Sequence, residues 1–453
     1  MTMRVAVVGA GPAGMYAIER LLERRGLIVE IDLYERLPTP WGLVRAGVAP
    51  DHPEKRLICD RQFDHLLKDP RVRFIGGVEI GLDIAPDELS RWYNAVIYAV
   101  GAASDTRMGI PGEELPGCRA AREFVAFYNG HPDFSERQFD LSSGRAVVVG
   151  NGNVALDVAR ILTLPIAELE KTDIADHALK ALRGSRIREV VIIGRRGQLQ
   201  AAFNNSELEE FEHLSGVDVT VEGEDLLEPG AGLDVTSWET RRKLDTLRRL
   251  TSRQLTSARK RIVIRFLASP LALIGQHKVQ QVSIQHNRLV RDTDGYMQAL
   301  PDDETSTLDA GLVLRAIGYR GVPLPGLPFD QERGVIRNQV GRVVDSAEQV
   351  LRGVYVSGWV KRGCRGIIGS NRKCARETVN HVFDDWALGH LEGYSMDKEH
   401  VLAVIRKRQP NSVSLGGWLA IDRKERDTGR QQQRPRVKLT DIAALHEAAH
   451  GRG

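Results

Sequence analysis

Along the first part of the chain, short apolar runs alternate with stretches whose apolar positions recur at helical spacing. Residues 5–8 and 29–34 are apolar runs rich in β-branched side chains, and residues 12–23 between them follow the helical pattern. Short apolar runs of this type are typical of strands buried in a parallel sheet. The pattern predicts strand, helix and strand, with further strands at 72–75 and 95–100.

The same order of patterns returns in the middle of the chain. An apolar run at 146–149 precedes a helical pattern at 156–162 and a second apolar run at 189–193, and a buried strand is predicted again at 310–317. Residues 103–143, before the second region, carry several Pro and Gly turn signals. We therefore expect two α/β domains joined by a crossover of the chain.

A glycine motif follows the first predicted strand. Gly9, Gly11 and Gly14 have the G-x-G-x-x-G spacing, and Glu35 ends the second predicted strand 21 residues after Gly14. In dinucleotide-binding folds these glycines make the tight turn, let the backbone approach a diphosphate and let helix and strand pack closely. A carboxylate about 20 residues further on accepts hydrogen bonds from ribose hydroxyls. The combination predicts a dinucleotide site.

A second glycine motif follows the strand at 146–149. Gly150, Gly152 and Ala155 have the G-x-G-x-x-A spacing, but the next predicted strand ends in Arg195 and Arg196 instead of an acid. Guanidinium groups pair with a 2′-phosphate, which a carboxylate would repel. This site is predicted to prefer NADP over NAD. The alternative is a solvated arginine pair on a loop.

Two different dinucleotide sites in one chain predict FAD together with NADP(H), and hence hydride transfer from nicotinamide to flavin. The third redox partner decides the class of enzyme. The four cysteines are scattered and form no C-x-x-C, which argues against a dithiol reductase, an iron–sulfur cluster or structural zinc. No metal site is predicted. A one-electron protein partner needs no further residues in this chain.

Composition and charge limit the class of protein and its expected location. The 453 residues are 42% hydrophobic and 27% charged, as in ordinary soluble proteins of two or three domains. A net charge of +3 is too small to indicate nucleic-acid binding. No apolar run approaches the ~20 residues of a membrane span. The first strand begins too early for a signal peptide to precede it, and a cytoplasmic location is expected.

Two charged regions have simpler alternatives. The stretch from Arg241 to Lys260 is strongly basic and predicts a helix over 240–260. A solvated helix face is one interpretation, and a docking surface for an acidic protein is the other. Near the C-terminus, residues 423–436 are arginine-rich and are predicted to form loops, followed by a short helix at 439–449.

Beyond the glycine motifs, longer segments resemble the adrenodoxin reductase-type ferredoxin–NADP reductases. The resemblance follows family order over nearly the whole chain and rests on five segments: residues 9–14, WGLVR with GVAPDHP at 41–53, GNGNVALDVARIL at 150–162, GRRGQLQAAF at 194–203 and GWVKRGCRGIIGSN at 358–371. GVAPDHP and GRRG-x-LQ-x-AF are far more specific than the glycine motifs.

The resemblance implies site residues. Those that would contact FAD are Ala13, Glu35, Leu43, Val78, Trp359, Gly366, Ile367 and Ile368. Those that would hold the NADP diphosphate are Asn151, Gly152, Asn153 and Val154, with Arg195 and Arg196 on the 2′-phosphate and Glu207 and Gly366 on the nicotinamide side. His52 and Glu210 resemble the polar pair that tunes hydride or proton movement. The alternatives are a loop-locking hydrogen bond for His52 and a solvated helix carboxylate for Glu210.

The family also implies a fold and an activity. The fold expected is α/β, with two doubly wound dinucleotide-binding domains of the glutathione-reductase-like type. The FAD domain spans 1–105 and 320–453, and the NADP domain at 106–319 is inserted in it. The activity expected is that of an FAD-dependent NADPH:ferredoxin oxidoreductase with a small acidic iron–sulfur protein as partner.

Two other functions stay open on sequence grounds: an NADPH-dependent flavin oxidase or hydroxylase acting on a small molecule, and a nucleotide-sensing binding protein. Departures from the family pattern at Gln198, Asn204–Ser206 and Cys364 leave rate and partner preference open. Cys364 and Arg365 would add bulk and charge beside the flavin loop.

Overall fold

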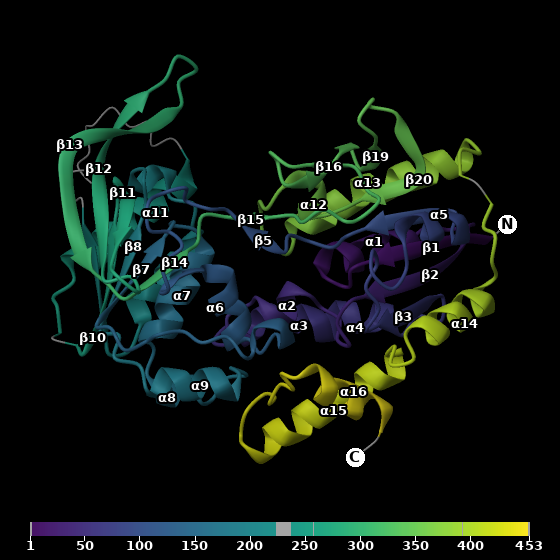
Figure 1. Cartoon of the computed structure of the whole chain (residues 1–453), viewed down its shortest axis with the longest axis horizontal. Helices are drawn as coiled ribbons and strands as arrows, with labels where there is room; N and C mark the ends of the chain where they lie inside the picture. Colours follow the sequence, from purple (N-terminus) through teal and green to yellow (C-terminus); the bar gives the residue numbers. More distant parts are fainter. Residues whose placement is uncertain (1, 223–236, 257, 392, 452–453) are drawn as a thin grey trace. The chain divides into compact units, whose positions relative to one another are not determined.

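A computed structural model describes residues 2–222, 237–256, 258–391 and 393–451. The chain forms two units, and Figure 1 traces their elements. The first unit comprises Met1–Val48, His52–Asp105 and Gly318–Gly453, and the second comprises Ala49–Asp51 and Thr106–Ile317. The divisions after Asp105 and Ile317 fall beside the expected borders at 105 and 319. The assignment of the short segment 49–51 to the second unit was not expected.

The first unit is built on a seven-stranded sheet in the order β18-β19-β20-β4-β1-β2-β3. Its strands are β1 (Thr2–Val8), β2 (Ile28–Glu35), β3 (Val72–Gly76), β4 (Ala95–Tyr98), β18 (Asn338–Gln339), β19 (Arg342–Val344) and β20 (Val350–Val356). β1 is parallel to both of its neighbours, β2 and β4, so the strand order reverses at β1. In open α/β sheets ligands bind at the carboxyl ends of the strands where the order reverses.

Helices and short strands complete the first unit. α1 (Pro12–Leu22) begins with proline, whose missing N–H costs nothing at a helix start, and its residues 13–18 are all buried. The other helices are α2 (Leu43–Ala46), α3 (Pro53–Ile58), α4 (Asp64–Leu67), α5 (Pro86–Trp92), α12 (Trp359–Arg362), α13 (Ser370–Ala387), α14 (Lys398–Arg408), α15 (Leu415–Gln431) and α16 (Ile442–His450). The paired short strands are β5 (Ser104–Asp105) with β15 (Tyr319–Arg320), and β16 (Phe329–Asp330) with β17 (Val335–Ile336).

The second unit has a six-stranded sheet in the order β6-β14-β7-β8-β10-β9. These strands are β6 (Cys118–Ala120), β7 (Arg145–Val149), β8 (Glu189–Ile193), β9 (Val217–Glu222), β10 (Lys260–Arg265) and β14 (Leu312–Arg315). β7 lies between β14 and β8 and is parallel to both, so the strand order reverses at the strand that leads into the second glycine motif. The antiparallel excursion is a separate sheet of β11 (Ala268–Ile274), β12 (Gln281–Arg291) and β13 (Met297–Asp309).

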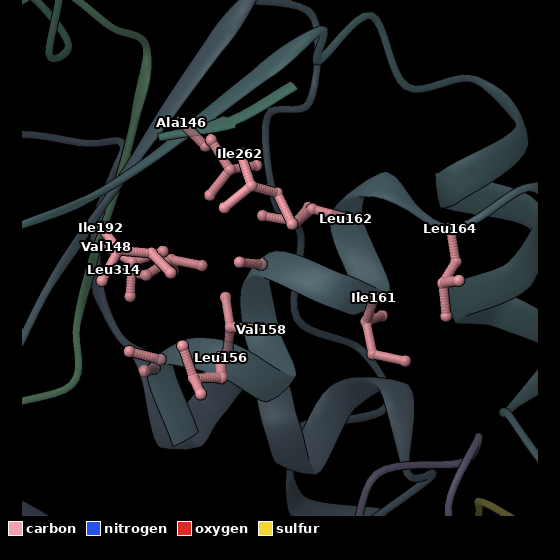
Figure 2. Packing of buried hydrophobic residues seen from close by; sticks show 14 of the residues in the cluster. Ala146, Val148, Leu156, Val158, Ile161, Leu162, Leu164, Ile192, Ile262 and Leu314 are labelled. Atoms are coloured by element: carbon pink, nitrogen blue, oxygen red, sulfur yellow. The ribbon is translucent and has the colours of Figure 1, made fainter. Parts of the chain in front are cut away.

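Helices of the second unit cover its parallel sheet. They are α6 (Ala121–Tyr128), α7 (Asn153–Thr163), α8 (Ile166–Leu169), α9 (Asp176–Arg183), α10 (Asn205–Glu209) and α11 (Trp238–Ser252). Figure 2 shows Leu156 and Val158 of α7 among apolar side chains from the strands, such as Val148 and Ile192. All four side chains are fully buried. This packing fixes α7 against the sheet, and with it the glycine turn from which α7 begins.

Two predictions of local structure were wrong. The prediction of loops at 423–436 was wrong for residues 423–431, because α15 runs through to Gln431, whereas residues 432–436 do form a loop. The first turn of α15 is capped by the Ser414 hydroxyl, which accepts from the N–H of Gly417. Arg, Lys and Glu are good helix formers, so their charge alone did not indicate a loop. The basic helix is shorter than predicted: α11 ends at Ser252, and Lys260 begins β10 instead.

Candidate functional site

The first glycine turn shows why each glycine is needed. A Cβ at Gly9 would lie 2.6 Å from the carbonyl oxygen of Ala99, and a Cβ at Gly14 would lie 2.0 Å from that of Gly9. Gly9 also has φ +105°, a conformation that other residues rarely adopt. A Cβ at Gly11 would meet nothing nearer than the Cα of Gly42, at 3.9 Å. Packing therefore explains Gly9 and Gly14, whereas the space beside Gly11 suits a diphosphate at the start of α1.

Glu35 lies at the end of β2 and is tied to this turn. Its carboxylate accepts the N–H of Ala10 at 2.9 Å and the N–H of Leu37 at 3.1 Å. Burial raises the pKa of Glu35, although both hydrogen bonds act in the opposite direction. The buried Val78 donates its N–H to the Glu35 carbonyl at 3.0 Å. This carboxylate is placed where a nucleotide ribose would offer hydroxyl donors.

Two loops from distant parts of the chain meet the same turn. The N–H of Trp41 donates to the carbonyl of Ala10 at 2.9 Å, and Leu43, two residues on, keeps 40% of its surface exposed. From the C-terminal region, Gly358 approaches α1 so closely that a Cβ there would lie 2.5 Å from the Cβ of Ala13. The structure thus brings Ala13 and Leu43 to one end of the sheet, together with the loop that carries Trp359.

The loop that carries Trp359 contains two buried polar groups, the Trp359 indole N–H and the Ser357 hydroxyl. Trp359 stacks on Tyr319 with ring centroids 5.6 Å apart. Among the described residues, neither the buried indole Nε1 of Trp359 nor the buried hydroxyl of Ser357 has a hydrogen-bond partner. Buried donors are rarely left unsatisfied, so they fit a bound group that supplies acceptors, as a flavin does. Gly366 and Ile367 are exposed in the following loop, whereas Ile368 packs against the core of the first unit.

The second glycine turn has the same steric constraint and the same open space as the first. Gly150 has φ +113°, and a Cβ there would lie 2.4 Å from the carbonyl oxygen of Ala316. A Cβ at Gly152 would have no atom within 4 Å. Asn151 accepts the N–H of Ala202 on its carbonyl at 3.2 Å, and the side-chain oxygen of Asn153 accepts the N–H of Asn204 at 2.8 Å. The open space at Gly152 suits a second diphosphate, and a loop from residues 201–204 holds the turn in place. Val154 packs partly against the core beneath it.

Arg195 and Arg196 follow β8 at the same end of this sheet. Their backbone carbonyls are fixed, because Arg195 accepts from the side chain of Asn287 at 3.0 Å and Arg196 accepts from the N–H of Leu267 at 3.2 Å. Their guanidinium groups have no ion-pair or hydrogen-bond partner within the part of the chain that the structure describes. Other arginines of this unit, such as Arg145 and Arg242, are paired with carboxylates. The guanidinium groups of Arg195 and Arg196 are therefore suited to an added phosphate.

The two residues of the expected polar pair belong to different units, and their pairing stays a prediction. His52 is 6% exposed, and its Nδ1 lies 2.8 Å from Nζ of Lys55 in the first turn of α3. In the second unit, Glu207 is buried in α10, and Glu210 follows directly after that helix. Glu210 is ion-paired to Arg160 and is not a freely solvated helix carboxylate, which excludes that alternative.

The basic stretch from Arg241 to Lys260 makes ion pairs and hydrogen bonds within its own unit. Arg242 pairs with Glu209 and Arg249 with Glu212, while Lys243 donates to the carbonyl of Ala201. These partners favour the interpretation of a structured, paired helix face.

Comparison with known proteins decides the family. Residues 3–224 match the family model described as pyridine nucleotide-disulphide oxidoreductase. NADPH-ferredoxin reductase FprA of Mycobacterium leprae is 47% identical over 99% of this chain and 98% of its own length. The mitochondrial NADPH:adrenodoxin oxidoreductase of Arabidopsis thaliana is 40% identical over 99% and 95%. The structure of Mycobacterium tuberculosis FprA in complex with NADPH superposes with a TM-score of 0.94 at 44% identity, covering both chains fully.

The chain belongs to the adrenodoxin reductase-type ferredoxin–NADP reductase family. Its four cysteines, Cys59, Cys118, Cys364 and Cys374, form no disulfide in the described structure. Burial raises the pKa of the Cys364 thiol to about 11. None of the described helices is long and apolar enough to cross a membrane.

Sequence reasoning missed two residues that contact predicted site residues or the loop bonded to them: Arg160, which pairs with Glu210, and Lys243, which bonds the carbonyl of Ala201. Arg160 lies within the GNGNVALDVARIL segment but appeared to be an ordinary helix residue. Lys243 was counted only as one of several basic residues. Position 160 follows Leu156 by four residues, so the two lie on the same face of the helix, and Leu156 is buried. An arginine on that face would be buried and would require carboxylate partners.

Proposed function

We propose that this protein is an FAD-dependent NADPH:ferredoxin oxidoreductase. NADPH supplies a hydride to FAD, and single electrons then pass to a small acidic iron–sulfur protein. The observation that carries the proposal is the contrast between the two glycine turns. Both leave open space for a diphosphate, but one is followed by Glu35 and the other by the unneutralised Arg195 and Arg196.

The binding residues follow from this contrast. Glu35 would accept from the ribose of FAD, and the indole N–H of Trp359 would find its acceptor on the flavin. Gly9, Gly14 and Gly150 form the turns, while Gly11 and Gly152 leave room for the two diphosphates. Leu43, Val78 and the loop 366–368 would complete the flavin side. Asn151, Asn153 and Val154 would complete the NADP diphosphate site, with Glu207 toward the nicotinamide.

His52 and Glu210 are proposed to tune the reaction electrostatically. The nicotinamide ring gains positive charge as the hydride leaves, and a carboxylate fixed nearby stabilises that charge. A lysine ammonium can only donate, so with Lys55 as the donor Nδ1 of His52 is the acceptor and the ring proton lies on Nε2. His52 would thereby present a hydrogen-bond donor, and neither residue would form a covalent bond with a substrate.

Docking of the iron–sulfur partner on the stretch from Arg241 to Lys260 is proposed on charge alone. Its internal ion pairs leave Arg259 among the exposed cations of the stretch. A cytoplasmic location is proposed as well, because the four thiols are unpaired and such thiols suit a reducing compartment.

The test is anaerobic reduction of the purified holoprotein by NADPH, followed by titration with oxidised ferredoxins. We expect the yellow flavin colour to bleach with NADPH faster than with NADH, and electrons to pass to a ferredoxin in a one-electron stoichiometry. A protein that binds no flavin, or a flavin that NADPH does not bleach, would rule the function out. Oxygen consumption tightly coupled to conversion of a small substrate would favour an oxidase or hydroxylase instead.

A further inference from the structure

Arg160 is an almost fully buried cation in the second turn of α7. Its guanidinium is 2% exposed and faces three carboxylates. Nη2 lies 2.8 Å from Oδ1 of Asp157 and 3.3 Å from Oδ1 of Asp51, while Nη1 lies 3.0 Å from Oε2 of Glu210. Burial acts to lower the pKa of Arg160, but the carboxylates outweigh it and raise the pKa further. The guanidinium therefore stays charged at every relevant pH.

The two edges of the guanidinium serve different partners. The edge of Nε and Nη2 donates hydrogen bonds to Asp51 and Asp157. Nη1 forms an ion pair with Glu210 without the geometry of a hydrogen bond. A purely structural role for Arg160 would be met by Asp51 and Asp157, whose side chains are each 17% exposed. The Glu210 side chain is 32% exposed, so the guanidinium contacts one side of the carboxylate and the other side stays accessible to solvent or a ligand.

Glu210 also has a like-charged neighbour. Carboxylate oxygens of Glu207 and Glu210 lie within 4.8 Å of each other, and Glu207 is only 7% exposed. Two carboxylates this close disfavour each other's ionised form, whereas a cation in contact favours it. Without the guanidinium, Glu210 would be free to turn away from its buried neighbour and would more readily take up a proton.

We propose that Arg160 is a positioning residue that fixes the Glu210 carboxylate for hydride transfer from NADPH. This rests on the proposed function, in which Glu210 faces the nicotinamide. Arginine is required at this position because its planar fork bonds several carboxylates at once, whereas a lysine ammonium is a single point charge on a flexible stem.

The test compares Arg160→Lys, Glu210→Gln and the double variant by anaerobic stopped-flow reduction of the flavin with NADPH between pH 5 and 9. In the wild type, the rate should fall at acid pH as Glu210 takes up a proton. Arg160→Lys keeps the charge, but the single ammonium group would be held by Asp51 and Asp157 and would lie farther from Glu210. The acid limb should therefore move to higher pH by about one unit, the lower end of the effect of a close opposite charge. The double variant should be no slower than Glu210→Gln alone, because Arg160 acts through Glu210.

A matched control and a second variant make the outcome decisive. Arg183 on α9 forms an exposed ion pair with Glu170, and Arg183→Lys should leave the pH profile unchanged. Should Arg160→Lys fail to fold, Glu210→Asp draws the carboxylate back from an intact Arg160 and should shift the acid limb in the same direction. An unshifted limb in the foldable variants, or additive losses in the double variant, would overturn the proposal. A wild-type flavin that NADPH fails to bleach would instead overturn the proposed function itself.

Discussion

The ammonium group of Lys55 donates a hydrogen bond to Nδ1 of His52, with 2.8 Å between the two nitrogens. The two residues are one helical turn apart at the start of α3, and the backbone N–H of Lys55 also donates to the carbonyl of His52 at 3.2 Å. With Lys55 as the donor, the bond favours the imidazole tautomer that carries its proton on Nε2. Lys55 thereby determines which ring nitrogen of His52 is available as a donor.

Replacing Lys55 with Met should slow the reaction without removing the flavin. Loss of one hydrogen bond of about 0.5–1.5 kcal/mol would let the imidazole populate both tautomers, so kcat for NADPH oxidation should fall about two- to tenfold. Lys55→Arg keeps a cationic donor and should retain most of the rate. The measurement is kcat with ferricyanide as acceptor, normalised to bound FAD. An unchanged kcat in Lys55→Met would show that the tautomer of His52 is irrelevant.

The arginine pair after β8 should decide between the two nicotinamide cofactors. Replacing Arg195 and Arg196 with Gln removes charge-assisted bonds to the 2′-phosphate worth about 1.5–3 kcal/mol each, or at least tenfold apiece in affinity. KM for NADPH should rise accordingly, while KM for NADH, which lacks that phosphate, should stay constant. Arg186→Gln, at an exposed position of the same unit, serves as the control. Equal losses for both cofactors would contradict the phosphate assignment.

The glycine turns allow a test that separates binding from folding. Gly11 and Gly152 have extended backbones, with φ −78° and −94°, and open space for a methyl group. Gly11→Ala should therefore fold but lose FAD, and Gly152→Ala should keep FAD but lose NADPH, because each methyl would occupy diphosphate space. Gly9→Ala should fail to fold, since its Cβ would meet the Ala99 carbonyl at 2.6 Å.

The readouts for these variants are flavin content by absorbance, NADPH affinity by titration and the midpoint of thermal unfolding. Gly144→Ala, at another glycine with no atom near its would-be Cβ, controls for the added methyl. Normal FAD and NADPH binding in Gly11→Ala and Gly152→Ala would mean that the open spaces serve no diphosphate.

The sequence was informative wherever a function depends on backbone shape. Gly9 and Gly150 are required by φ and by a neighbouring carbonyl, constraints that act between adjacent residues and strands and so leave a spacing that can be read directly. Glu35 was predictable for a similar reason, because the end of a strand next to a glycine turn is a fixed place in the fold. The glycines and Glu35 could thus be predicted because their positions follow from the short strand–turn–helix–strand segments in which they lie.

Long-range charge pairing could not be read in the same way. Arg160 meets Asp51 across 109 positions of sequence, and Glu425 meets Arg45 across 380. Each of these residues is unremarkable among its sequence neighbours, and only the fold shows that the arginine of one segment lies against the acid of another. Within the part of 423–436 that is helical, the buried Glu425 shows the same difficulty, because only the fold reveals the arginine that pairs with it.

Lys243 should support NADPH binding without touching the nucleotide. Its Nζ donates to the carbonyl of Ala201 at 2.7 Å and lies 5.3 Å from the ring centroid of Phe203, in the loop that bonds to Asn151 and Asn153. Lys243→Met would release the loop, so KM for NADPH should rise about two- to tenfold at nearly constant kcat. Lys243→Arg should preserve KM. A fall in kcat with unchanged KM would place Lys243 in a different role.

Glu425 joins α15 to the short helix α2, which contains Arg45. The carboxylate is fully buried, bonds the guanidinium of Arg45, and accepts from Arg436 at 2.9 Å and from the N–H of Leu439 at 2.8 Å. Burial acts to raise the pKa of Glu425, but Arg45 and Arg436 outweigh it, so the pKa lies below the usual carboxyl range. A carboxyl with a lowered pKa in the folded state stabilises the fold above its ordinary pKa and loses that contribution as the pH falls.

Glu425→Gln should therefore destabilise the protein in a pH-dependent way. At neutral pH the variant removes the buried carboxylate that faces Arg45 and Arg436, although Asp422 still pairs with Arg436. Breaking a buried ion pair costs about 3–5 kcal/mol. The difference from the wild type should shrink below about pH 4.5, the ordinary carboxyl range, where the wild type begins to lose the same contribution. Chemical unfolding across pH measures this difference, with the exposed Glu447→Gln as control. Parallel stability curves for Glu425→Gln and wild type would show that the ionised carboxylate is not what holds α15 to α2.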